Sequence, residues 1–373
     1  MPRLVHGAGA ARCCSLVGRR VCLAACCLAS VSRLVVIVLG GWPSSELALP
    51  ELLAELQTLP RNLSLASGWC GHMGFTESRK TGAIACARVS TRHQRRARVV
   101  FAGCARGVSS RLKNVVSMLA RLGEQLGGRR SATVIFENDS EDDTRAQLLA
   151  WAELQRVRSV QLLLARRVRG SRTVRLAGCR NALLGEALAL GARFLVMLDL
   201  DCKRALPDAR PLLRALETLR RREWDVLTAN SAAGRDYYDL WALRSAALGV
   251  EDDCWRRGGD ARGNNCDALE LRINASAPVA AVDSAFNGLA VYRLDTIRRR
   301  AAACAYDGAA TCEHVSFHLC LRAHGLRLGL APYLVQSCGD GAPREIVGPP
   351  RVRTRVLASG EVRHSTVNEH EGT

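Results

Sequence analysis

The stretch Phe194-Leu195-Val196-Met197-Leu198-Asp199-Leu200-Asp201 decides the fold class of this chain. Its five leading apolar residues are typical of a strand that is buried on both faces in a parallel sheet. Asp199 and Asp201 then stand at the carboxyl end of the strand, where open α/β sheets bind their ligands. Residues two apart in a strand point the same way, so a local bend aims both carboxylates at one cation. Two hard oxygen ligands there favour Mg²⁺ or Mn²⁺ carrying a phosphate group, whereas the alternative is a strand end with two solvated acids.

The segments before this stretch alternate between strand and helix patterns. A helix over residues 110–126, for example, carries Leu112, Val115, Leu119 and Leu122 on one apolar stripe. This βαβαβαβ alternation predicts an α/β fold with a mostly parallel sheet and helices on both faces. The expected strands begin at residues 99, 133, 160 and 194, and the expected helices cover 110–126, 144–154 and 180–190.

Composition divides the 373 residues into four parts. We expect a leader at 1–45, a stem or capping region at 46–97, the main α/β domain at 98–341 and a polar tail at 342–373. The stem contains a helix pattern over residues 47–59. The tail is rich in Pro and Arg, which predicts partial disorder.

The leader combines a basic flank with an apolar run from Val21 to Trp42. This pattern favours a signal-anchor helix with its N-terminus in the cytoplasm. Arg33 opposes that interpretation, because a central arginine costs about 2.5–3.5 kcal/mol on insertion scales. A cleaved signal peptide and an Arg-rich organelle transit peptide are the open alternatives.

The net charge of +18 does not predict nucleic-acid binding. Of the 53 basic residues, all but Lys80, Lys113 and Lys203 are arginine, and they are spread along the chain. A nucleic-acid surface would be clustered and interleaved with aromatic residues, which make up only 5% here. The charge suits an anionic donor, such as a nucleotide sugar, or an anionic membrane surface.

The 16 cysteines include no C-x-x-C pair, so a zinc ribbon or a thioredoxin-type site has no support. Scattered cysteines suit a few disulfides in an oxidising compartment. We expect the local pairs Cys254–Cys266 and Cys304–Cys312.

The order of motifs resembles the nucleotide-sugar-binding half of GT-A glycosyltransferases. An acidic Ser/Thr loop follows the second strand, an Arg-Asn pair precedes the Asp-x-Asp strand, and Asn181 lies 18 residues before Asp199. The resemblance implies that the Asp-x-Asp element binds a metal and the donor diphosphate. It further implies a set of donor-binding residues: Glu137, Asn138, Asp139, Arg180, Asn181 and Asp199.

Three downstream blocks are similar to the CAP59 group, which includes an α-1,3-mannosyltransferase. They are residues 237–244 (YYDLWALR), 286–292 (FNGLAVY) and 312–318 (CEHVSFH). The resemblance covers about residues 98–335. It implies a Golgi or ER membrane enzyme with a lumenal catalytic domain, or alternatively one in a plastid or other organelle. Its donor would be GDP-mannose or a UDP-sugar, and its acceptor a glycan or glycoprotein.

Glycosyl transfer places negative charge on the leaving diphosphate. A cation held by Asp201, with Asp199 nearby, would neutralise that charge. The resemblance implies a late histidine as a further metal ligand, with His318 the first choice and His314 the second. The alternative is a polar helix start without a metal.

Glu313 and Asp283 are the candidate catalytic carboxylates. Either would act as the base of an inverting reaction or orient the acceptor in a retaining one. For Asp283 the alternative is a turn residue before a strand.

The candidate sugar or acceptor contacts follow the second half of the resemblance. For Trp241 the alternative is a place in the hydrophobic core, and for Asn287 it is a turn. They are Tyr238, Asp239, Trp241, Arg244 and Asn287.

The sequence therefore predicts a metal-dependent glycosyltransferase (EC 2.4) that moves a hexose, such as mannose, to a glycan or protein. A catalytically silent sugar-binding scaffold and a nucleotidyltransferase are the alternatives. A haloacid-dehalogenase-type phosphatase, which shares the Asp-x-Asp strand, needs a later lysine, and none follows Lys203.

Overall fold

The computed structural model describes residues 63–67, 85–91, 96–126, 128–155, 159–202, 209–232, 235–254, 269–336, 338 and 351–367. The predicted leader and the predicted helix at 47–59 lie outside these ranges. Among the helices within them, none is both long enough and apolar enough to cross a membrane.

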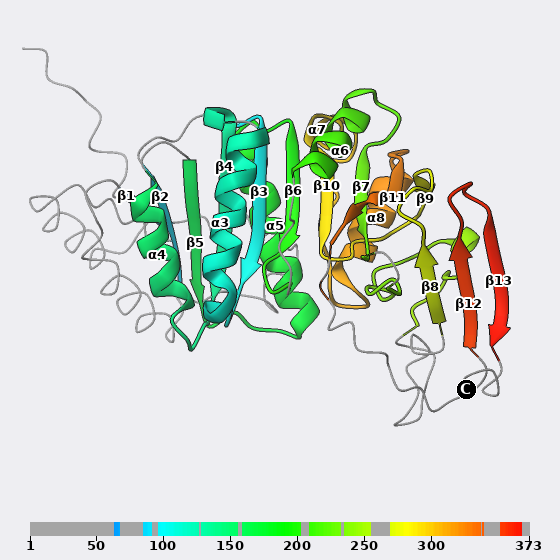
Figure 1. Ribbon diagram of the computed structural model, residues 1–373. Coiled ribbons are helices and arrows are strands. Elements are labelled where there is room, and N and C mark those ends of the chain that lie inside the picture. Colours follow the sequence, from blue (N-terminus) through cyan, green and yellow to red (C-terminus); the bar gives the residue numbers. More distant parts are fainter. Residues whose placement is uncertain are drawn as a thin grey trace, which may run out of the picture.

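A ten-stranded sheet forms the centre of the molecule, in the order β1-β2-β5-β4-β3-β6-β10-β7-β11-β9 (Figure 1). Four adjacent strands in its middle are parallel, as the sequence predicts. They are β5 (Ser159–Arg166), β4 (Ser131–Asn138), β3 (Val99–Ala105) and β6 (Phe194–Asp199).

The rest of the sheet is mixed, because β10 (Leu289–Arg293) runs antiparallel between β6 and β7 (Val226–Asn230). Beyond β7 lie β11 (Leu328–Val335), which is parallel to it, and the short β9 (Ala280–Ala281). At the opposite edge, β2 (Ala85–Thr91) and β1 (Leu63–Ser67) add antiparallel strands. The region predicted to be a stem or cap therefore contributes two strands to the main sheet.

Helices cover both faces of the sheet (Figure 1). One apolar layer is built with α3 (Ser109–Leu126), α4 (Thr144–Leu154) and α6 (Arg210–Arg220). The other uses α5 (Arg172–Ala189), α7 (Leu294–Arg300) and α8 (Glu313–Ala323). The predicted stripe of α3 is buried against the first layer. At the start of α5, the Ser171 hydroxyl caps the helix by accepting a hydrogen bond from the Val174 N–H.

A second sheet of three strands contains β8 (Leu269–Ile273), β12 (Arg351–Val356) and β13 (Val362–Val367). β12 pairs in parallel with β8 and antiparallel with β13. The prediction of a partly disordered tail is therefore wrong for residues 351–367. Its composition is polar, but Val352, Thr354 and Val356 alternate with arginines, which is the period of a strand.

The order of the central strands creates a switch point between β3 and β6. From β3 the chain moves through β4 to β5 in one direction, and α5 then carries it back to β6 on the other side of β3. Crevices at the carboxyl ends of strands open at such switch points. Asp199 ends β6 here, so the fold places the predicted metal site where α/β sheets bind ligands.

Three disulfides join described residues: Cys104–Cys179, Cys202–Cys338 and Cys304–Cys320. The predicted pair Cys304–Cys312 is wrong, because Cys304 bonds to Cys320 on α8 and Cys312 is a buried free thiol. Cys254 is also disulfide-bonded. Its predicted partner, Cys266, lies outside the described ranges.

Candidate functional site

Arg180 joins three parts of the molecule at the carboxyl end of β6. Its Nη2 donates to Asp199 Oδ1 at 2.9 Å, and its Nε donates to Glu313 Oε1 at 2.9 Å. The guanidinium is 2% exposed and lies over the Phe286 ring at 4.7 Å. Burial alone would lower the pKa of Arg180, but the charges of Asp199 and Glu313 outweigh burial and raise it. The neighbouring Cys104–Cys179 disulfide ties this part of α5 to β3.

The negative charge of Asp199 acts on two neighbouring carboxylates, those of Asp201 and Asp239. The pKa of Asp201 is raised by burial and then by the Asp199 charge. The pKa of Asp239 is raised to about 6, again by burial first and by Asp199 second. Asp239 Oδ1 accepts from the Ala242 N–H at 3.3 Å, and Oδ2 accepts from the Asn287 N–H at 3.1 Å. This end of the sheet therefore gathers carboxylates that repel one another.

Arginines from the first turns of two helices face the same carboxylates. Arg111 of α3 donates to the backbone carbonyl of Asp201. Arg172, the first residue of α5, and Arg111 both lower the pKa of Asp201, against the larger opposing effects. The sequence analysis did not single out either residue. The sequence feature that could have identified them is their position in the first turns of α3 and α5, the helices that border the switch point.

Tyr238 is the exposed aromatic residue of this group, with 48% of its surface accessible. Its pKa is raised by partial burial and by the charges of Asp239, Asp201 and Asp199, in that order. The Tyr238 hydroxyl is therefore close enough to feel the charges of these carboxylates, and its contact with a sugar stays a prediction.

The acidic loop after β4 uses its carboxylates to hold the scaffold. Glu137 is fully buried; its Oε2 accepts from Arg145 Nε at 2.5 Å, and its Oε1 accepts from the Ser140 N–H. Asp139 accepts from the backbone N–H groups of Arg167 and Val168, after β5. Donor binding by Glu137 and Asp139 stays a prediction, and both carboxylates already have partners.

The same loop is tied to the start of α3. Asp142 accepts from the Ser109 N–H at 3.0 Å and from the Thr144 N–H at 3.1 Å. These hydrogen bonds hold the pKa of Asp142 well below its usual range. Asn138 donates to Asp139 Oδ2 at 3.1 Å and is itself buried. The loops after β3, β4 and β5 thus form one hydrogen-bonded unit.

Three other predicted contact residues have internal partners. Asn181 makes two hydrogen bonds with the backbone of Tyr306, at 2.9 and 2.8 Å. Arg244 is buried and donates to the carbonyls of Trp241 and Leu243. Asn287 has a left-handed φ of 53°, is fully buried and donates to the Gln336 carbonyl. These positions shape the loops around the site. A turn was the alternative that the sequence left open for Asn287, and substrate contact by all three residues stays a prediction.

Trp241 packs against the hydrophobic core and is partly buried. Its position fits the core alternative that the sequence left open.

Both ring nitrogens of His318, the first choice for a further metal ligand, are hydrogen-bonded within the protein. Its Nδ1 is hydrogen-bonded to Ser284 Oγ at 3.1 Å, and its Nε2 to Tyr292 Oη at 2.9 Å. Burial, followed by the charge of Arg180, lowers its pKa to about 3. Metal binding by His318 stays a prediction, and both of its ring nitrogens already have partners within the protein. His314, the second choice, is also buried and stacks on Phe286 at 3.7 Å.

The two predicted catalytic carboxylates lie at opposite ends of α8. Glu313 begins the helix and contacts Arg180, whereas Asp283 pairs with Arg322 near its end, at 3.1 Å. A rise of about 1.5 Å per residue separates these two helix positions by roughly 14 Å. Asp283 is therefore not brought into the group around Asp199. Glu313 is in that group, but it is 2% exposed and positions Arg180.

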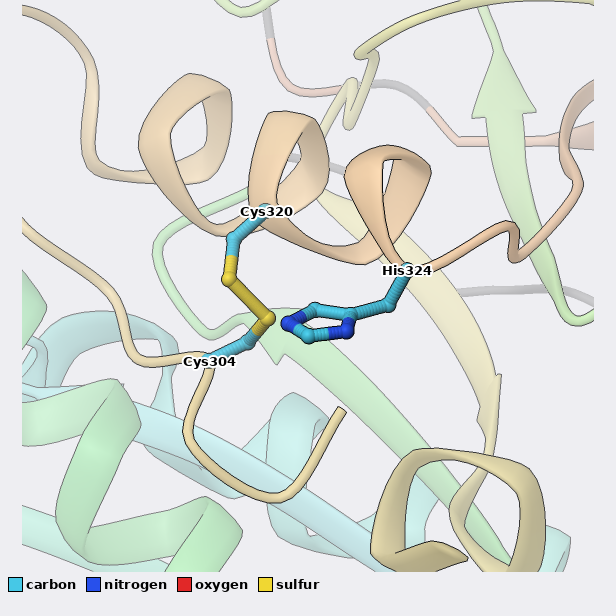
Figure 2. A group of neighbouring side chains, drawn as sticks. All are labelled: Cys304, Cys320 and His324. Carbon is cyan, nitrogen blue, oxygen red and sulfur yellow. A yellow bond between two sulfur atoms is a disulfide. The ribbon is translucent and has the colours of Figure 1, made fainter. Parts of the chain in front are cut away.

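The carboxylates at β6 fit a cation that brings its own ligands. Among the described residues, the set of three His, Cys, Asp or Glu ligand atoms within 4.8 Å of one another is Cys304, Cys320 and His324. The sulfur atoms of Cys304 and Cys320 form a disulfide, and the His324 ring lies beside it (Figure 2). Asp199 and Asp201 do not belong to this set, so the end of β6 offers a cation only a few protein oxygens. Mg²⁺ in nucleotide sites uses one or two carboxylates and takes the remaining ligands from water and phosphate, which matches this donor set.

No family model matches the chain, and no curated protein matches it. Solved structures match with low scores. A mannosyltransferase from Pyrobaculum calidifontis in complex with GDP-Man and Mn²⁺ is 15% identical, with a TM-score of 0.42; the match covers 68% of this chain and 59% of that one. S. aureus TarS 1–349 in complex with UDP-GlcNAc is 11% identical, with a TM-score of 0.40, over 67% and 62%. A cytidylyltransferase from Leptospira borgpetersenii is 15% identical, with a TM-score of 0.32, over 65% and 82%. At these scores the likeness carries no functional argument.

Proposed function

We propose that this chain is a metal-dependent glycosyltransferase with a GT-A-like fold, transferring a hexose from a nucleotide sugar to a glycan or protein. The observation that carries the proposal is the group at the switch point. Asp199 and Asp201 stand at the carboxyl end of β6, where α/β sheets bind their ligands, and the positive charges of Arg111 and Arg172 act on Asp201. Carboxylates for a divalent cation and arginines for phosphate oxygens are the complementary requirements of a nucleoside diphosphate.

In this proposal the carboxylates bind the cation and the arginines contact the diphosphate. Asp201 and the free oxygen of Asp199 would hold Mn²⁺ or Mg²⁺, while Arg180 fixes the Asp199 carboxylate in place. When bound, the cation supplies Lewis-acid stabilisation of the charge that develops on the leaving diphosphate. Arg111 and Arg172 add positive charge on the same side. The diphosphate is thereby oriented against the end of β6.

Asp239 and Tyr238 are the residues best placed to contact the sugar. The Tyr238 ring is exposed beside the carboxylates, and an aromatic face can pack on the C–H surface of a hexose. Asp239 is partly exposed and fixed by two backbone N–H groups. A carboxylate held in this way accepts hydrogen bonds from sugar hydroxyls or from the acceptor. In this proposal Glu313 positions Arg180 and does not act as the base.

Golgi or ER localisation, membrane anchoring and mannose as the transferred sugar remain parts of the proposal that rest on the CAP59 resemblance. The disulfides are compatible with an oxidising compartment.

Thermal shift with GDP-mannose, UDP-glucose, UDP-galactose, UDP-xylose and UDP-GlcNAc, each with and without Mn²⁺, tests the proposal. One donor should stabilise the protein only when Mn²⁺ is present, by about 2.7 kcal/mol at 100 times its dissociation constant. The same donor should be hydrolysed or transferred. Metal-dependent binding without any turnover would favour the sugar-binding scaffold, and donor binding that is indifferent to Mn²⁺ would contradict the proposal.

A further inference from the structure

Three arginines stand side by side at the edge of the sheet opposite the carboxylates. Val99 of β3 pairs in register with Ser131 of β4 and with Phe194 of β6. Arg98, Arg130 and Arg193 therefore stand directly before three neighbouring parallel strands, which lie about 4.8 Å apart. Their backbones are also joined, because the Arg98 N–H donates to the Arg130 carbonyl and the Arg193 N–H donates to the Arg98 carbonyl.

A fourth arginine reaches this row from α6. The guanidinium of Arg220, at the end of that helix, lies 6.0 Å from the centroid of the Phe194 ring, and that of Arg193 lies 5.4 Å from it. We call Arg98, Arg130, Arg193 and Arg220 the arginine row. Phe194 is fully buried, so its ring is a fixed surface against which two of the guanidinium groups rest.

The arginine row lacks compensating acids among the described residues. Arg98, Arg130 and Arg193 form no ion pair there, and Arg220 meets only the half-exposed Glu217, at 3.5 Å. The Nε of Arg220 is buried and has no hydrogen-bond partner. The pKa of Arg98 is lowered chiefly by the charge of Arg220, then by burial, Arg193 and Arg130. Like charges thus act on one another in a row in which Arg220 Nε has no acceptor.

We propose that the arginine row binds a phosphate or sulfate dianion at the amino-terminal edge of the sheet, away from the carboxylate site. Guanidinium groups present planar pairs of N–H donors that match the oxygens of such groups. A dianion would supply acceptors to the exposed N–H groups of these guanidiniums and would offset their mutual repulsion. This site is independent of the proposed transferase activity, because it shares no residue with the group around Asp199.

Sulfate binding to the full chain tests this inference. Thermal shift and calorimetric titration with sodium sulfate are compared with sodium chloride at equal ionic strength, in metal-free buffer without donor. The double variant Arg98→Gln/Arg193→Gln removes two positive charges from the row. The matched control, Arg299→Gln/Arg363→Gln, removes two from exposed arginines that pair with Asp295 and Glu361.

We expect wild type and control to bind sulfate equally and the row variant to bind at least about tenfold more weakly, since charged hydrogen bonds are lost. Without sulfate, the row variant should melt no lower than wild type, because repulsion has been removed. Equal loss of binding in both double variants would show a general charge effect and overturn the inference. So would a wild type that responds equally to sulfate and chloride.

Vesicles of phosphatidylcholine, with and without phosphatidic acid, distinguish the source of the dianion. Binding to the phosphatidic acid vesicles that disappears in the row variant identifies a lipid headgroup. Sulfate binding without vesicle binding identifies a soluble anion. Both results support the site.

Discussion

The loops after β4 and β6 are both acidic, yet their carboxylates have opposite surroundings. After β4, Asp142 accepts two backbone N–H groups, which hold its pKa well below the usual range. After β6, burial and the charge of Asp199 raise the pKa of Asp201, and the same two causes raise that of Asp239. The first loop is stabilised by its charges, whereas the second gathers charges that destabilise one another.

This difference separates a scaffold from a binding site. Acid content alone would rank the β4 loop higher, since residues 137–143 contain five Asp or Glu residues. The β6 group differs because its carboxylates carry more negative charge than the neighbouring hydrogen-bond donors offset. A bound cation would neutralise this excess. The comparison therefore supports the proposal that the end of β6 binds the metal and that the carboxylates after β4 hold the scaffold.

The largest stability effect is expected from Arg180→Gln. The substitution leaves Asp199 and Glu313 without their buried partner, and breaking a buried pair typically costs about 3–5 kcal/mol. The free energy of unfolding from urea denaturation measures this loss. The counterpart near the β4 loop is Arg145→Gln, which breaks a buried pair with one acid, Glu137.

The two variants sharpen the comparison when donor binding is measured as well. Arg145→Gln should lose less stability than Arg180→Gln and should keep Mn²⁺-dependent donor binding wherever it folds. A buried pair should contribute clearly more than about 1 kcal/mol. If the free energy of unfolding of Arg180→Gln lies within about 1 kcal/mol of the wild-type value, Arg180 does not organise the site.

The local part of the fold could be predicted from the sequence. The α4 helix was expected at 144–154 and lies at Thr144–Leu154, and α3 starts one residue before its expected bound. Apolar periodicity within one element fixes such features. It does not show that β10 inserts between β6 and β7, or that β12 pairs with β8, because these pairings join segments distant in the chain.

The site was predicted in part. Asp199 and Asp201 followed from a strand and its end, and Arg180 from the motif order. The partners of His318 and Asn181 depend on loops that meet only in the folded chain. Arg111 and Arg172 gave no signal beyond ordinary helix starts, in a chain with 50 arginines.

A smaller stability effect is expected from Asp142→Ala. Asp142 accepts from the first N–H groups of α3 and α4, and losing a comparable contact at a helix start costs about 0.5–2 kcal/mol. Because the folded pKa is depressed, this contribution is present above the unfolded pKa of about 3.9 and is lost as the pH falls further. Thermal unfolding of wild type and variant at pH 7 and pH 3 should show the difference shrinking at the lower pH. A difference that does not change with pH would mean that the Asp142 charge contributes nothing.

The smallest expected effect on stability comes from Asp239. Its ionisation destabilises the folded state, whereas ionisation of Asp142 stabilises it. The folded pKa of Asp239, about 6, lies above the unfolded value, so the folded state holds the proton more tightly. In metal-free buffer this group should reduce stability as the pH rises from about 4 to 6, by no more than about 1 kcal/mol given its partial exposure. Unfolding free energies across this range should fall less in Asp239→Asn than in wild type, since the raised pKa of Asp201 remains in both. Parallel curves would contradict the assigned environment.

Side-by-side turnover of Asp201→Ala and Asp142→Ala tests the central claim most directly. Both variants lose one loop carboxylate, and both are assayed for Mn²⁺-dependent hydrolysis or transfer with the donor that the thermal shift identifies. We predict that Asp201→Ala loses activity by about 10²–10³-fold or more, as when a group that stabilises transition-state charge is removed, and keeps its melting temperature. Asp142→Ala should melt earlier and retain its turnover. Full activity in folded Asp201→Ala, or a matching loss in Asp142→Ala, would contradict the assignment of chemistry to the end of β6.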